Sequence, residues 1–194
     1  LREVNHRVAN SLQLISSLIG LQARKTENAQ AQAMLSQAAK RVEAVALVHR
    51  RLYASGEVGF VEIDQYFSGL VEELGRAVDE AGHRIELAAE PIRMVTDKAV
   101  PLGLIVNELV TNALKYAYPE GTAGVVRVGF RRCGADELEL AVEDDGIGFP
   151  EPAEAPRGSG LGAVIVDAMA RSLGATLSRT PRPQGTRFVL RLAS

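Results

Sequence analysis

Apolar positions in residues 1–54 recur every three or four residues, a spacing that predicts two long amphipathic helices. The first helix is expected from about Leu1 to Arg24 and the second from about Asn28 to Ala54. The second carries a heptad seam made of Leu35, Ala38, Val42, Val45, His49 and Leu52. A lone hairpin of two such helices cannot cover both apolar faces, and a second copy would complete a four-helix bundle. We therefore expect a homodimer through the helical hairpin.

The period changes after the segment SGEVG, residues 55–59, which predicts a boundary between a domain at 1–57 and a domain at 58–194. In the second domain, helical spacing is expected at 63–78, 97–116 and 161–173, and strand alternation at 84–88, 125–131, 138–142, 175–179 and 186–192. This order predicts an α+β chain whose second domain is an α/β sandwich, with a mixed or mostly antiparallel sheet covered on one face. The segment PEPAEAPR at 150–157 is expected to be a mobile loop.

Composition narrows the class of protein without identifying it. The 194 residues are 46% apolar with a net charge of −2, which is ordinary for a globular protein and offers no nucleic-acid surface. Cys133 is the single cysteine, so an internal disulfide is excluded, and a reducing, cytoplasmic location is expected. No apolar run approaches the ~20 residues of a membrane span, so we expect no membrane contact by this chain. The chain starts within a helical pattern, and any upstream sensor domain is expected to lie outside it.

One helix of the second domain carries candidate chemistry. Glu108, Asn112 and Lys115 share the side opposite its apolar residues, at the i, i+4 and i+7 positions. The ordinary alternative for such a stripe is a solvated helix face. The chemical interpretation is specific, because hard oxygen atoms suit Mg²⁺, a lysine suits a phosphate, and a carboxylate can take a proton.

Two glycine clusters follow along the chain. In EDDGIGFP, residues 143–150, Asp144 can accept a hydrogen bond from an amino-bearing ring, and Gly146 and Gly148 allow a flat ligand to approach the backbone. An Asp-Gly pair after a strand is also a common turn. In GSGLG, residues 158–162, glycines precede a helix and can aim backbone N–H groups at an anion. Neither cluster has the Walker or the Rossmann spacing.

The order of these features, closed by the strand motif Gly185-Thr186-x-Phe188, resembles the GHKL (Bergerat-type) ATP-binding domain over about residues 60–194. The resemblance implies ATP and Mg²⁺ as cofactors, with Asn112 holding the metal. It also makes Glu108 a second candidate ligand of the metal or a general base. The nucleotide contacts that it implies are Asn112, Lys115, Tyr116, Asp144, Gly146, Gly148, Arg157, Gly158, Gly160, Leu161, Gly162 and Thr186.

The hairpin carries two further motifs, E-x-x-H-R-x-x-N in its first helix and V-H-x-x-L-Y near the end of its second. They resemble the dimerisation and phosphoacceptor domain of sensor histidine kinases, in the type-two subfamily related to the HWE kinases. The resemblance makes His6 the phosphoacceptor. Helical geometry agrees, since His6 projects about 150° away from the apolar stripe and its neutral ring is a nucleophile near neutral pH. Arg7 occupies the place where the commoner subfamily has an acid, so the general base stays open between Glu3 and Glu108. Asn10 could orient a water for the reverse, phosphatase step.

The sequence therefore predicts the catalytic core of a sensor histidine kinase. Such a core phosphorylates His6 from Mg-ATP and passes the phosphoryl group to an aspartate of a response-regulator receiver domain. One alternative is a dimeric phosphotransfer or scaffold module whose ATP site is regulatory. Another is a GHKL ATPase that couples hydrolysis to conformational change, which the short acceptor-type hairpin disfavours.

Overall fold

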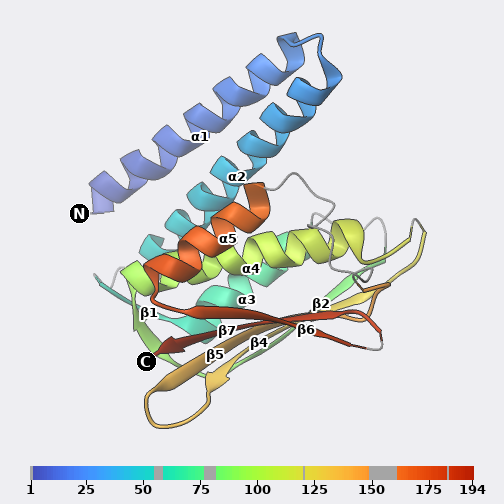
Figure 1. Cartoon of the computed structure of the whole chain (residues 1–194). Coiled ribbons are helices and arrows are strands. Elements are labelled where there is room, and N and C mark those ends of the chain that lie inside the picture. Colours follow the sequence, from blue (N-terminus) through green and yellow to red (C-terminus); the bar gives the residue numbers. More distant parts are fainter. Residues whose placement is uncertain (1, 55–58, 77–81, 120, 149–160, 183) are drawn as a thin grey trace. The chain divides into compact units, whose positions relative to one another are not determined.

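The computed structural model describes residues 2–54, 59–76, 82–119, 121–148, 161–182 and 184–194 (Figure 1). The chain divides into two compact units, Leu1–Gly59 and Phe60–Ser194. Each unit is described here on its own. The predicted segment at 150–157 lies outside the described residues.

The first unit is a hairpin of two helices, α1 (Arg2–Lys25) and α2 (Ala29–Ala54). The helices are joined by a short turn in which the Asn28 side chain accepts a hydrogen bond from the Ala31 N–H and so caps the start of α2 (3.0 Å). Between the helices, the buried Ser16 hydroxyl contacts the Ala39 carbonyl and the Glu43 carboxylate at 3.0 Å each. Small residues such as Ala39 allow the two helices to pack closely.

An apolar stripe remains exposed on the hairpin. The exposed large apolar side chains of this unit are Val8, Leu14, Ile15, Leu18, Leu21 and Met34. Leu14 and Met34 keep about six tenths of their surface in solvent, at 62% and 61%. Exposed apolar side chains gathered on one element commonly mark an interaction site.

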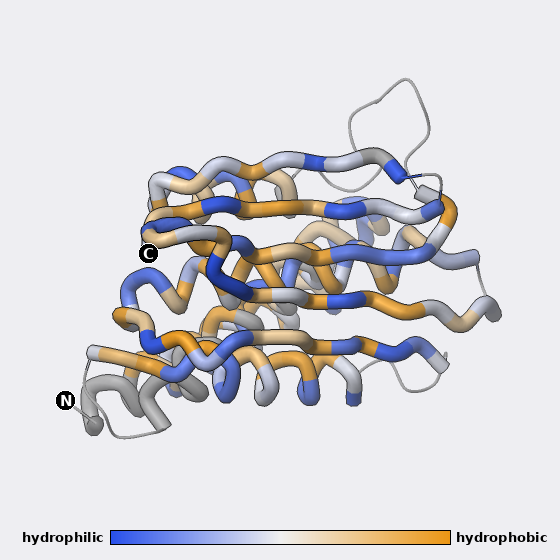
Figure 2. The backbone as a smooth tube through the Cα atoms, turned by 90° about the horizontal axis from the view of Figure 1, so that it is seen from below, coloured by the Kyte–Doolittle hydropathy of each residue, from blue (hydrophilic) through white to orange (hydrophobic). Residues whose placement is uncertain are grey.

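The second unit places helices on one face of a mixed sheet. The structure describes β1 (Phe60–Glu62), α3 (Ile63–Arg76), β2 (Arg84–Ala89), β3 (Arg93–Val95), α4 (Thr96–Tyr116), β4 (Val125–Arg132), β5 (Glu137–Asp144), α5 (Leu161–Ser172), β6 (Thr176–Pro181) and β7 (Thr186–Ala193). The main sheet has the order β2-β4-β5-β7-β6, and only the β2–β4 pair is parallel. Helices α3, α4 and α5 lie on the same side of it, as Figures 1 and 2 show. The predicted α+β class and one-sided sandwich are confirmed. The sequence pattern missed the ribbon of β1 and β3, because three residues are too few to show an alternation.

Alternation along each strand decides what the two faces of the sheet carry. In β5, Leu138, Leu140 and Val142 are almost fully buried, and the intervening positions belong to the opposite face. The core beneath the helices also holds Phe67 and Phe130, whose rings meet edge to face with centroids 5.6 Å apart.

The face of the sheet without helices carries charge. One row of neighbouring residues crosses it as Glu86, Arg127, Glu143 and Arg187, each opposite the next in register. A second row is centred on Glu139, which is only 3% exposed although no helix covers it. Three arginines surround its carboxylate: Arg131 at 2.9 Å, Arg191 at 3.3 Å and Arg187 at 3.4 Å. The sequence analysis did not single out this cluster.

Candidate active site

Helix α4 brings the carboxylate, the amide and the ammonium to one region, but in three different environments. Glu108 is buried at 8% exposure, Asn112 is half-buried and Lys115 is exposed. The alternative of a solvated helix face therefore does not hold for Glu108. The physical reason is that α4 packs against α5 as well as against the sheet, so part of its polar side is covered. The hard oxygen atoms of Glu108 and Asn112 lie one helical turn apart, a donor set that suits Mg²⁺ shared with a phosphate.

Asp144 ends strand β5 on the helix-covered face and is 7% exposed. Its carboxylate accepts hydrogen bonds from the backbone N–H of Gly146 (3.0 Å) and from the backbone of Thr186, which lies opposite it in register. Burial raises the pKa of Asp144, and these two backbone donors only partly offset that effect. Thr186 is itself buried. The result is a fixed, buried hydrogen-bond acceptor at the end of a strand.

The turn after Asp144 is wedged between the end of α4 and the start of β7. The Ile147 N–H donates to the Ala117 carbonyl at 2.8 Å. A Cβ added to Gly146 would lie 2.1 Å from that same carbonyl oxygen, and one added to Gly185 would lie 1.9 Å from the Asp144 carbonyl oxygen. Both contacts are with backbone atoms, so neither can be relieved by moving a side chain. Glycine is required here so that three backbone segments can meet.

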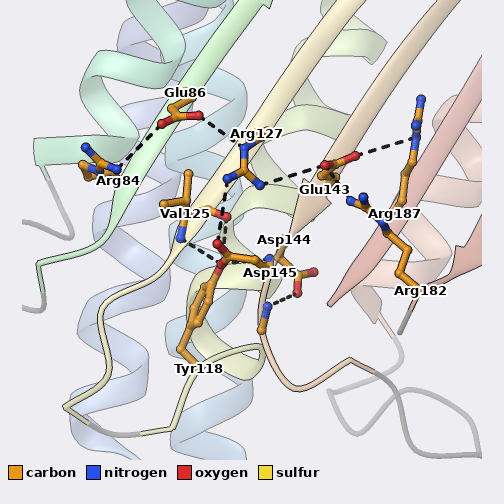
Figure 3. A network of polar contacts seen from close by, with 11 residues as sticks. Arg84, Glu86, Tyr118, Val125, Arg127, Glu143, Asp144, Asp145, Arg182 and Arg187 are labelled. Carbon is orange, nitrogen blue, oxygen red and sulfur yellow. Dashed lines mark hydrogen bonds and ion pairs between the residues drawn. The ribbon is translucent and has the colours of Figure 1, made fainter. Parts of the chain in front are cut away.

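Asp145, which the sequence analysis passed over, is the centre of a polar cluster beside this turn (Figure 3). Its carboxylate accepts hydrogen bonds from the Tyr118 hydroxyl (2.9 Å) and the Val125 N–H (3.1 Å), and it lies 3.9 Å from the Arg127 guanidinium. Burial alone would raise the pKa of Asp145, but these hydrogen bonds and Arg127 outweigh it and lower the pKa. No sequence signal distinguishes this carboxylate, because its partners come from other elements.

His83 is likewise tied to this cluster. Its position in the sequence Gly82-His83-Arg84 predicts a surface residue in a turn. In the structure its Nδ1 accepts a hydrogen bond from the Gly124 N–H (3.1 Å), and its ring packs against that of Tyr118 with centroids 5.0 Å apart. His83 is therefore half-buried, because its turn packs against the segment that leads into β4.

The remaining predicted residues fall into three groups. Arg157, Gly158 and Gly160 lie outside the described residues. Leu161 is the first residue of α5, and Gly162 is buried in the first turn of that helix. Gly148, two residues after Gly146, has a positive φ of 72°. Tyr116 is exposed at the end of α4.

On α1 of the hairpin unit, the described side chains begin at Val8. Glu3 and His6 therefore lie on the helix with their side chains undescribed, and Asn10 is exposed one turn beyond His6.

The described part of the chain lacks two features that would change its interpretation. No group of three or more histidine, cysteine, aspartate or glutamate side chains in it could hold a metal ion by itself. Among the described helices, none is long and apolar enough to cross a bilayer.

Comparison with known proteins identifies the family. Residues 3–78 match the model described as "Histidine kinase", and residues 97–194 match the model described as "Histidine kinase-, DNA gyrase B-, and HSP90-like ATPase". The chain belongs to the histidine kinases, and the predicted family is confirmed.

The relatives and similar structures agree with this assignment. The chain is 32% identical over 196 residues to the sensor histidine kinase PdtaS of Mycobacterium tuberculosis, covering 99% of this chain and 39% of that protein. It is 29% identical over 190 residues to blue-light-activated histidine kinase 2 of Erythrobacter litoralis, covering 96% and 54%. The chain thus spans about two fifths to about half of these curated relatives.

The solved structures show the same fold. The histidine kinase domain of the blue-light-activated kinase EL346 of Erythrobacter litoralis superposes with a TM-score of 0.73 at 23% identity, over 94% of this chain and 95% of that one. Full-length ShkA, solved in complex with AMPPNP, superposes with a TM-score of 0.58 at 19% identity, over 98% of this chain and 44% of that one.

Proposed function

We propose that this chain is the catalytic core of a sensor histidine kinase, which uses Mg-ATP to phosphorylate His6 and then passes the phosphoryl group to an aspartate of a receiver domain. One observation carries the proposal. An acceptor-type helix with His6 and a sandwich with the buried acceptor Asp144 occur in one chain, in the order of the two family models. We place the acceptor domain at 1–57 and the ATP-binding domain at 58–194.

Asp144 is the proposed contact to the adenine amino group. Its carboxylate is buried and held by the backbone of Gly146 and Thr186, so it presents a fixed acceptor to a ring donor. Gly146 and Gly148 carry no side chain of their own, so a flat base could approach the backbone of this turn. A buried acceptor also penalises a base that presents a carbonyl oxygen in place of the amino group.

The phosphate end is proposed at the C-terminal half of α4 and the start of α5. Asn112 would hold Mg²⁺, with Glu108 as a second candidate ligand, and Lys115 would approach the phosphates. The N–H groups at the start of α5, where Gly162 lies, suit a phosphate, and the glycines at 158 and 160 would extend that site. Mg²⁺ would supply charge neutralisation for the phosphates.

His6 is the proposed nucleophile. A neutral ring nitrogen attacks the γ-phosphorus of ATP, the bond between the γ-phosphorus and the bridging oxygen breaks, and ADP leaves with the electron pair. The proton that the ring loses passes to a base, for which Glu3 and Glu108 are the candidates. Asn10, exposed one turn further along α1, would orient a water for dephosphorylation. Normal dephosphorylation of the partner regulator by an Asn10→Ala protein would contradict this last role.

The exposed apolar stripe of the hairpin supports a homodimer. A second copy that packs α1 and α2 against the same helices would cover Leu14, Leu18 and Met34 and form a four-helix bundle. The receiver domain of a response regulator is the proposed acceptor of the phosphoryl group from His6.

The test is incubation of the full chain with Mg²⁺ and γ-labelled ATP, with the variants His6→Gln, His49→Gln and His83→Gln in parallel. These are the three histidines of the chain, so the series identifies the modified one. The expected label is stable to alkali, labile to acid, and absent only from His6→Gln. Transfer of the label to a purified receiver domain would then test the second step.

The other outcomes each favour an alternative. Label that persists in His6→Gln would exclude His6 as the acceptor. Nucleotide binding without any label would favour the scaffold with a regulatory ATP site. Steady hydrolysis without stoichiometric label would favour an ATPase that couples hydrolysis to conformational change.

A further inference from the structure

A single tyrosine hydroxyl joins three elements beside the proposed adenine contact. We propose that Tyr118 and Asp145 are positioning residues that hold the turn after β5, and so aim the Asp144 carboxylate at the base of the nucleotide. This inference rests on the proposed function, because it assumes that Asp144 receives the adenine amino group. Neither residue is placed in contact with the nucleotide.

The hydrogen bonds of the clamp are specific. The Tyr118 hydroxyl lies 2.9 Å from the Asp145 Oδ1 and 2.9 Å from the Val125 carbonyl oxygen, and the Asp145 N–H lies 3.4 Å from the hydroxyl. A hydroxyl has one proton to donate, so it serves the carboxylate or the carbonyl at a given moment. The same Oδ1 also accepts from the Val125 N–H at 3.1 Å. The segments that directly follow α4 and β5 are therefore joined at one point to the start of β4 (Figure 3).

The ring of Tyr118 is held as firmly as its hydroxyl. A Cβ added to Gly124 would lie 1.9 Å from the Tyr118 Cε1, so the ring lies directly against the backbone of that glycine. The His83 ring packs on Tyr118 and accepts the Gly124 N–H, which fixes the glycine as well. Few rotamers are open to a ring enclosed in this way, so the hydroxyl can act as a fixed point.

Because Asp144 and Asp145 are adjacent in the chain, the contacts that hold Asp145 also restrict Asp144. Successive residues of a strand share a peptide unit and direct their side chains to opposite faces. When Asp145 is held by Tyr118 and Val125, the peptide between the two aspartates has little freedom, and the Asp144 carboxylate keeps its hydrogen bond from the Gly146 N–H. The ion pair of Asp145 with Arg127 is long, at 3.9 Å, and both side chains are more than two fifths exposed, so it is the weaker contact.

The experiment compares the affinities of the full chain for Mg-ATP and Mg-ITP by calorimetric titration. Inosine has a carbonyl oxygen where adenine has the amino group, so the ratio of the two affinities reports how well Asp144 is aimed. The variants are Tyr118→Phe, Asp145→Ala and Asp145→Asn, with Asp144→Ala as the reference for complete loss of the contact. Tyr66→Phe is the control, because it removes the hydroxyl of another tyrosine of the same unit, one that is buried and has no hydrogen-bond partner among the described residues.

We expect Tyr118→Phe and Asp145→Ala to lower the affinity for ATP about tenfold and to leave that for ITP nearly unchanged, since one well-placed hydrogen bond is worth about that factor. Asp145→Asn retains an acceptor for Tyr118 and Val125, so it should keep the preference for ATP within about threefold of wild type. Tyr66→Phe should match wild type for both nucleotides.

The results that overturn the inference are distinct from those that overturn the proposed function. An unchanged ratio in Tyr118→Phe, or an equal loss of ATP and ITP affinity together with a lower melting temperature, would show that the clamp is structural only. A wild-type chain that does not bind ATP, or binds ATP and ITP equally well, would instead contradict the role proposed for Asp144.

Discussion

Replacement of Glu139 by glutamine tests how the open face of the sheet is stabilised. The Glu139 side chain is 4% exposed, yet the groups that cover it are Arg131, Arg187 and Arg191 rather than apolar side chains. Glutamine keeps the size of the side chain and an acceptor oxygen but removes the charge. The variant therefore isolates the electrostatic part of the interaction.

The loss of stability expected for Glu139→Gln depends on how exposed its three arginine partners are. A buried hydrogen bond to a charged group is worth about 1.5–3 kcal/mol, whereas an exposed ion pair is worth about 0.2–1 kcal/mol. The three guanidiniums are 36–61% exposed, so each pair belongs near the lower range. Three pairs at about 0.5 kcal/mol each predict a loss of about 1.5 kcal/mol for Glu139→Gln. Glu86→Gln is the control, because Glu86 lies on the same face, pairs with Arg127 at 3.3 Å and is half exposed, so its loss should stay below about 0.5 kcal/mol.

Urea denaturation of the full chain measures this difference. Three of the four tyrosines lie in the sandwich unit, so their near-ultraviolet circular dichroism follows the unfolding of that unit. With a slope of about 1–2 kcal/mol per molar urea, the midpoint of Glu139→Gln should fall by roughly 1 M. A midpoint equal to that of Glu86→Gln, or above that of wild type, would refute the assignment of stability to the arginine cluster.

The difference in unfolding free energy between wild type and Glu139→Gln should depend on pH in a defined direction. Burial alone would raise the pKa of Glu139, but the hydrogen bonds from Arg131 and Arg191 outweigh it and lower the pKa. The stabilisation is therefore present above the ordinary glutamate pKa of about 4.3 and is lost as the pH falls through the lowered value. Glu139→Gln cannot titrate, so the difference in unfolding free energy from wild type should shrink below about pH 4. A constant difference from pH 7 to pH 3 would contradict this account.

Three further substitutions test other parts of the structure. Gly146→Ala places a Cβ 2.1 Å from the Ala117 carbonyl oxygen, so the turn must shift. The affinity for ATP should therefore fall at least tenfold, about 1.4 kcal/mol. An unchanged affinity in a titration with ATP would contradict this prediction. Leu18→Lys introduces a charge at an apolar position that is 53% exposed in one copy; sedimentation equilibrium should show weaker dimerisation, and an unchanged dimer would exclude this stripe as the interface. Ser16→Ala removes the buried hydroxyl that contacts the Ala39 carbonyl and should lower the unfolding free energy of the hairpin by about 1 kcal/mol. An unchanged thermal unfolding curve of α1 and α2 would contradict this contribution.

Periodicity alone was sufficient to predict the elements that are long enough to show it. Helix α4 was expected at 97–116 and runs from Thr96 to Tyr116, and β5 was expected at 138–142 and runs from Glu137 to Asp144. Both carry a one-sided apolar pattern, which the burial of a single face imposes on a sequence. The three-residue strands β1 and β3 carry no readable pattern and were missed.

The candidate site residues that the sequence proposes are local in sequence. Asp144, Gly146 and Gly148 belong to one short segment, and Asn112 and Lys115 lie on one helix. The order of the motifs along the chain was therefore enough to propose them. The clamp of Tyr118 and Asp145 joins residues 27 positions apart, and the contact between Arg191 and Glu139 joins residues 52 positions apart. Strand register decides which side chains meet over such distances, and no local pattern encodes it.

The sequence by itself determined the family, the order of the two units and the identity of the chemical groups, because these depend on residue type and on spacing within single elements. The tertiary structure decided which carboxylates are buried. Glu108 faces a covered side of α4, and Glu139 lies beneath three arginines on a face without helices. It also decided that Asp145 and His83 form part of a polar cluster. Burial and hydrogen bonding depend on what the neighbouring elements place beside a residue, and only the packed fold supplies those neighbours.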